Sequence, residues 1–182
     1  KIGEDLFPRD FIINIKAPTN YIGAAKIFGF ENPNGEEKEP LDIFRAIDDY
    51  DPPFFKTINK FNKEDLPEYL PKSLEKAIQS FILTCAIRRL RGHENKHNSM
   101  LIHISRYTLW QNSLKDLIDV YVRDLQSSLQ LDDPSNPSSI FATFERIWFK
   151  YYSEIIEHVS DYLPKGYDDE FLKPISFEKI KN

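Results

Sequence analysis

Residues 73–92 read SLEKAIQSFILTCAIRRLRG, and this stretch decides the fold expected for the chain. Its apolar residues recur at intervals of three and four, which predicts one long amphipathic helix with a single apolar stripe of Leu74, Ala77, Ile78, Phe81, Ile82, Cys85, Ala86 and Leu90. Gly92 marks the end of this helix. Cys85 lies on the apolar stripe, so we interpret it as a packed thiol and not as a nucleophile. The last turn carries three cations that complement the helix dipole, namely Arg88, Arg89 and Arg91.

Two more long helices are expected further along the chain. One begins at Thr108, which forms a capping-box pattern with Gln111, and it ends near residues 129–131. The other begins near Ser138 or Ser139 and ends before Pro164. Each of the three helices should span about 18–24 residues. Aromatic residues at helical spacing are more typical of a core than of a base-stacking platform, and the last helix carries Phe141, Phe144, Trp148, Tyr151 and Tyr152.

Short strands are expected beside these helices. Residues 99–105 contain the apolar run MLIHI, and Phe11–Ile15 is a second run of strand length. A short helix over residues 21–28 should end at Gly29, after an N-cap at Thr19 or Asn20. Residues 30–70 are rich in proline and read as irregular connections, with one element of open type around residues 41–47. The predicted fold class is therefore α/β and mainly helical, with few short strands and three long amphipathic helices.

The predicted organisation has two parts within a single-domain fragment of a longer protein. Residues 1–70 would hold the N-terminal strand, the short helix and the Pro-rich connection, and residues 71–182 would form a helical α/β module with the 99–105 strand. The lack of an initiator Met suggests a piece cut from a longer chain. No apolar run is long enough for a membrane helix. A single cysteine fits a reducing compartment, and we expect a cytoplasmic protein.

The charge of the chain is unevenly distributed. The net charge is −5, from 24 basic and 29 acidic residues. Residues 71–115 hold eight basic and two acidic side chains, a net charge of +6, so the remaining 137 residues carry −11. This pattern indicates a face that could meet an anion such as a phosphate backbone. A solvated helix face explains the same pattern, and composition alone favours that explanation.

One short motif matches a catalytic pattern, and a second catalytic pattern is missing from the sequence. Residues 93–97 read HENKH and match the H-E-x-x-H motif of zinc proteases. The motif follows the predicted helix stop at Gly92 and is fully polar, so a loop without bound zinc is the better interpretation. The sequence has no G-x-x-x-x-G-K-[ST] loop, so we expect no nucleotide hydrolysis by this chain alone.

The segment after the predicted 99–105 strand is the best candidate for a binding site. Ser105, Arg106 and Thr108 stand where a strand would meet the N-terminus of the next helix, which is a common position for a phosphate. The arginines of the preceding helix (Arg88, Arg89 and Arg91) should lie within reach of the same surface. The alternative is that Thr108 only caps, Ser105 only turns and Arg106 pairs with a carboxylate. His103 could be a buried histidine.

Three stretches resemble the Z1 domain family, whose name is linked to endonucleases. They are LFPRDFI at 6–12 with NYIGA at 20–24, LPKSL at 70–74 with AIRRLRG at 86–92, and HNSMLIHISR at 97–106. They follow the order of the family and cover about residues 4–125. The resemblance implies a bacterial or phage protein that is associated with helicase-like superfamily-two ATPases and with DNA restriction or defence.

The resemblance also implies where this chain would stand in such a protein. A Walker-type ATPase lobe would precede it, and residues 100–108 would be the first strand and phosphate-contacting loop of a second RecA-like lobe. ATP and Mg²⁺ would then belong to the parent protein, with no cofactor, metal or complete active site in this chain. The expected partners are DNA and the flanking ATPase lobes, with no membrane. A helical module that docks other lobes and touches no DNA is the alternative.

Overall fold

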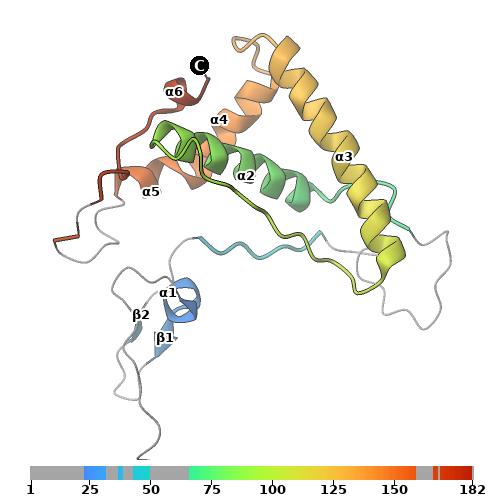
Figure 1. The fold of residues 1–182 in the computed structure, drawn as a ribbon, viewed down its shortest axis with the longest axis horizontal. Coiled ribbons are helices and arrows are strands. Elements are labelled where there is room, and N and C mark those ends of the chain that lie inside the picture. The colour runs from blue at the N-terminus through green and yellow to red at the C-terminus, as the bar shows by residue number, and fades with distance from the viewer. Residues whose placement is uncertain are drawn as a thin grey trace, which may run out of the picture. The chain divides into compact units, whose positions relative to one another are not determined.

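The structure is a computed structural model that describes residues 23–31, 37–38, 43–49, 66–158, 166–167 and 169–181. The chain divides into two compact units, each described by itself below. The first comprises Lys1–Arg45 with Leu163–Tyr167, and the second comprises Ala46–Tyr162 with Asp168–Asn182. Figure 1 labels the helices and strands of both units along the chain. The strand expected at residues 11–15 and the N-cap expected at Thr19 or Asn20 lie outside the described residues.

The first unit contains a short helix and a two-stranded antiparallel sheet. Helix α1 spans Ala24–Phe28 and ends at Gly29, which has a φ of +73°. The expected helix end is confirmed, but α1 begins at residue 24 and not at 21, because Gly23 is extended. Strand β1 (Phe30–Glu31) pairs antiparallel with β2 (Glu37–Lys38), within a stretch that we expected to be irregular.

The second unit is a helical assembly. It contains α2 (Lys72–Leu90), α3 (Thr108–Leu131), α4 (Ile140–Tyr151), α5 (Ser153–Glu157) and α6 (Phe177–Lys181). Helix α2 packs against α4 and α6, and α3 packs against α4 (Figure 1). The predictions for α2 and α3 are confirmed in position and length. In the part of the chain that the structure describes, no helix is long and apolar enough to span a membrane.

Helix α2 is buried on two sides, each of which packs against a different hydrophobic cluster. Towards its C-terminal half, Leu83 and Ile87 are buried against α4 and α6. Towards its N-terminal half, Ile78 is buried with Leu70, Leu114 and Leu125. The predicted stripe of α2 included Ile78 but missed Leu83 and Ile87, since a single amphipathic face was assumed. The aromatic stripe of α4 is core as expected, because Phe144 and Trp148 are both buried.

The third long helix is divided at Tyr152, so the prediction of one uninterrupted helix is wrong. Tyr152 has φ −123° and ψ −40°, away from helical values, and it separates α4 from α5. Its hydroxyl donates a hydrogen bond of 2.8 Å to the carbonyl of Ser80 on α2. The hydroxyl oxygen of Tyr152 also lies 3.1 Å from Oγ1 of Thr84. These contacts hold Tyr152 against α2 at the point where the two short helices meet.

The strand predicted within residues 99–105 is not formed, and with it the expected RecA-like sheet is absent from the described residues. Met100, Ile102 and Ile104 pack on the helical cluster that contains Ile78 and Leu114. Their alternation therefore reflects an extended segment with one side on two helices, and no neighbouring strand pairs with it among the described residues. The second unit is helical where the structure describes it, which confirms the prediction of a mainly helical fold, whereas the strands expected there beside the helices are not found among the described residues.

The end of α2 confirms the role expected for Gly92. Gly92 has a φ of +90°, its N–H donates to the carbonyl of Arg89 at 2.9 Å, and the N–H of His93 donates to that of Arg88 at 2.9 Å. This pair of bonds is the Schellman pattern, which satisfies carbonyls that the helix leaves open.

Replacing Gly92 with alanine should lower the free energy of unfolding by about 1–2 kcal/mol, because a Cβ disfavours a positive φ. The nearest atom to such a Cβ would be a ring carbon of Phe171 at 3.7 Å, an ordinary contact, so the cost comes from the backbone. Urea unfolding followed by circular dichroism measures the loss. Gly92→Asn is the control, because asparagine tolerates this conformation better. Equal losses in both variants would contradict the explanation.

Candidate nucleic-acid interface

Arg106 is held on the surface directly before α3. Its Nη2 donates a hydrogen bond of 3.1 Å to the hydroxyl of Tyr107, and its guanidinium carbon lies 5.1 Å from the centre of that ring. The hydrogen bond to Tyr107 raises the pKa of Arg106 further above its ordinary value. A carboxylate partner was the alternative expectation, and Arg106 makes no ion pair with the described residues. The guanidinium is therefore exposed and charged.

The start of α3 differs from the predicted capping box. Tyr107 is the N-cap residue and provides no side-chain cap, while Thr108 is the first helical residue and is exposed. The side chain of Gln111 donates instead to the carbonyl of Ser105 at 2.7 Å. The hydroxyl of Ser105 accepts from the N–H of Tyr107 at 3.2 Å, so its turn role is confirmed. The first N–H groups of α3 thus lack a side-chain cap, and Arg106 and Thr108 lie beside them.

The arginines at the end of α2 have different surroundings. Arg89 is exposed, whereas Arg88 and Arg91 are half-buried. Burial lowers the pKa of Arg91 from its ordinary value, and Asp169 acts in the opposite direction. Arg91 thus interacts with the segment after α5, and Arg89 has the most exposed side chain of the three.

The structure does not bring the two groups of cations to one rim. The first two turns of α3 lie beside the segment that leads into α2, because the hydroxyl of Ser113 donates to the carbonyl of Pro67 at 3.2 Å. Arg106 is therefore near the N-terminal end of α2. The other three arginines, Arg88, Arg89 and Arg91, lie at its C-terminal end. Helix α2, with 19 residues and a length of about 27 Å, thus lies between the two groups. The short separation in sequence was misleading, because residues 93–105 run back along the helix.

The histidines of the H-E-x-x-H pattern lie outside any helix, as expected. Residues 93–97 form turns after the end of α2. The ring of His93 is half-buried and packs on Phe171, with ring centres 4.3 Å apart. His97 is exposed, and so is His103, which contradicts the idea of a buried histidine there. No cluster of three potential ligands occurs within the described ranges.

The purified chain should contain no stoichiometric zinc, because two histidines in a loop do not share the helix face that the motif needs. Metal analysis by mass spectrometry after dialysis checks this. One tightly bound zinc per chain that is lost in a His93→Ala/His97→Ala variant would contradict it.

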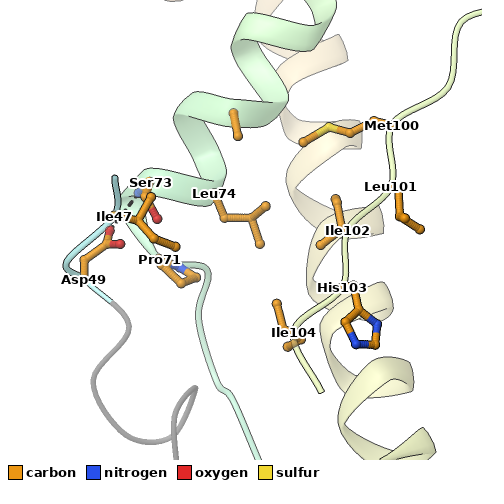
Figure 2. Close-up of a pocket in the computed structure, with 11 residues that line it drawn as sticks. Ile47, Asp49, Pro71, Ser73, Leu74, Met100, Leu101, Ile102, His103 and Ile104 are labelled. Atoms are coloured by element: carbon orange, nitrogen blue, oxygen red, sulfur yellow. Dashed lines mark hydrogen bonds between the residues drawn. The ribbon is translucent and has the colours of Figure 1, made fainter. Parts of the chain in front are cut away.

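A groove beside the start of α2 was not expected from the sequence. It has a volume of about 430 Å³ and is mostly apolar, with walls from the first turns of α2 and from residues 100–104. Asp49 borders it and accepts a hydrogen bond of 2.7 Å from the N–H of Ser73, which caps α2 (Figure 2). Hydrogen bonding from Ser73, through its side chain and its backbone, lowers the pKa of Asp49. No local signal predicts this cap, since the two residues are 24 positions apart.

Comparison with known proteins places the helical part of the chain in a family. A model of the Z1 domain matches residues 73–182, more than half of the chain. The chain belongs to the Z1 domain family. The Z1 match begins in the first turn of α2 and includes all helices through α6, whereas the resemblance noted above covered about residues 4–125. No curated protein and no solved structure matches the chain.

Proposed function

We propose that this Z1 domain is a nucleic-acid-associated module of a longer, helicase-like protein in DNA restriction or defence. The observation that carries the proposal is the exposed guanidinium of Arg106 beside the uncapped N-terminus of the 24-residue helix α3. A helix N-terminus and an arginine together favour an anionic group such as a phosphate. The net charge of +6 over residues 71–115 supports the same ligand.

The catalytic steps of such a protein would lie outside this chain. We infer that ATP and Mg²⁺ bind flanking ATPase lobes in the cytoplasm, and that any nuclease site also lies in the flanking polypeptide. This Z1 domain would then contribute contacts to the DNA backbone. Such contacts orient the nucleic acid and carry no sequence information by themselves.

Replacing Arg106 with alanine should weaken DNA binding by about 5- to 100-fold at low salt, the usual range for a charge-assisted hydrogen bond to phosphate. The slope of log affinity against log salt should fall by about one, and the loss should be similar for unrelated DNA sequences. Fluorescence anisotropy with labelled DNA measures both quantities. Lys115→Ala is the matched control, because Asp119 neutralises Lys115 at 3.4 Å. An unchanged affinity and slope in Arg106→Ala would overturn the assignment.

A second candidate is a helical module that docks flanking lobes and binds no DNA. The apolar groove beside α2 favours it, and so does Leu101, whose side chain is 92% exposed at the edge of that groove. Salt dependence separates the two candidates. Phosphate contacts release counterions and weaken steeply with salt, and apolar docking does not.

A further inference from the structure

Residues 93–107 connect the C-terminal end of α2 to the start of α3. The segment leaves the C-terminal end of α2 at Gly92 and runs back beside the helix to the start of α3 (Figure 1). Its residues 100–104 line the same groove as Pro71, Leu74 and Ala77 from the first turns of α2. Residues 100–104 therefore lie against the first turns of α2, and the residues before them lead back from its C-terminal end.

The side chains of residues 100–104 alternate between two directions. Figure 2 shows Met100, Ile102 and Ile104 directed towards the groove, and Leu101 and His103 directed away from it. Lys96, His97, His103 and Arg106 are all exposed. The apolar contacts thus hold an extended backbone in place, and its outer side presents groups that can bind an anion.

The cations of this segment differ from others on the same helices. Arg89, Lys96 and Arg106 make no ion pair with the residues that the structure describes. In contrast, Lys72 lies 2.8 Å from Glu75, and Lys115 lies 3.4 Å from Asp119. Residues 88–107 contain five lysines and arginines and one acidic residue, Glu94. Their charge is thus largely uncompensated, which is the electrostatic pattern of a phosphate-binding surface.

We propose that Arg89, Lys96, His97, His103 and Arg106 form one basic track that binds the backbone of a nucleic-acid duplex. This inference deepens the proposed function and rests on it. Arg89 and Arg106 lie at opposite ends of α2, whose own length is about 27 Å, and a duplex rises about 3.4 Å per base pair. A duplex must therefore exceed about eight base pairs to contact both Arg89 and Arg106 at once.

Ligand length tests the track directly. The 182-residue chain is titrated by fluorescence anisotropy with duplexes of about 6 and about 16 base pairs, each closed by a synthetic linker, over a series of salt concentrations. The Arg89→Ala/Arg106→Ala variant should lower the salt slope by about two on the long duplex and by about one on the short one, since the short duplex reaches a single end. The Lys72→Ala/Lys115→Ala variant removes two paired cations and should leave both slopes unchanged.

The possible outcomes distinguish a failure of the proposed track from a failure of nucleic-acid binding itself. If the wild-type chain binds but the double variant lowers the slope equally on both duplexes, the two ends do not share one ligand and the track is wrong. If the wild-type chain binds and neither arginine affects the slope, the binding surface lies elsewhere. If the wild-type chain binds neither duplex, even at low salt, the nucleic-acid function itself fails, and the track fails with it.

Discussion

Replacing Trp148 with alanine should lower the free energy of unfolding by about 3–5 kcal/mol, the usual cost of removing a large aromatic side chain from a core. Trp148 is 3% exposed and belongs to the cluster that joins α2, α4 and α6. Its ring stacks on Tyr152 at 6.1 Å between centres and lies the same distance from Phe177. The change would leave a cavity at the meeting point of three helices. Urea unfolding measures the loss through the far-ultraviolet circular dichroism.

The neighbouring residue provides the control for this prediction. Phe149 is 64% exposed, so Phe149→Ala should change the free energy of unfolding by about 0.5 kcal/mol or less. Both variants remove an aromatic ring from the same helix at adjacent positions, and they differ in burial. Similar losses in the two variants would show that α4 is not oriented as described, and a stable Trp148→Ala variant would contradict the packing of α4 on α2.

Replacing Leu83 with alanine should cost about 2–5 kcal/mol, because the side chain is 2% exposed and fills the space between α2 and α4. The result is informative because Leu83 is outside the stripe that the sequence predicted for α2. A single amphipathic face would leave Leu83 near solvent and make the substitution almost neutral. The same unfolding experiment distinguishes the two arrangements.

Leu101→Ala is the control for Leu83. This substitution removes the same number of atoms as Leu83→Ala, but from a side chain that extends into solvent. The free energy of unfolding should therefore fall by no more than about 0.5 kcal/mol. A small effect of Leu83→Ala together with a large effect of Leu101→Ala would reverse the assignment of inner and outer surfaces. In that case the segment at residues 100–104 would have to face the core with its other side.

Local signals in the sequence were sufficient for several elements. The start of α4 follows from Ser139, whose hydroxyl accepts a hydrogen bond from the N–H of Ala142 at 3.3 Å. The end of α2 follows from Gly92, because only glycine readily adopts its φ of +90°. The loop position of the H-E-x-x-H pattern follows from the same glycine. In each of these cases the deciding interaction joins residues within about five positions, so the sequence window contains both partners.

The arrangement of the candidate site was predicted only in part. The exposed side chain of Arg106 and the turn at Ser105 could be inferred from their position before α3. Their distance from the arginines of α2 could not, because it depends on the path of residues 93–105 across the surface of two helices. The groove and the cap that Asp49 provides for α2 were missed for the same reason, since their partners are far apart in sequence.

The sequence by itself determined where α2 and α3 lie, that α2 ends before Gly92 and that α4 begins after Ser139, because these choices depend on neighbours along the chain. The tertiary structure decided three other features. It divided the last long helix where Tyr152 bonds to Ser80, it made α2 a helix buried on two sides, and it left residues 100–104 extended without a strand partner. Alternating apolar residues only require that one side of the segment is shielded from water, and either a sheet or a pair of helices can provide that shielding. Which of the two is present depends on contacts that no short stretch of sequence contains.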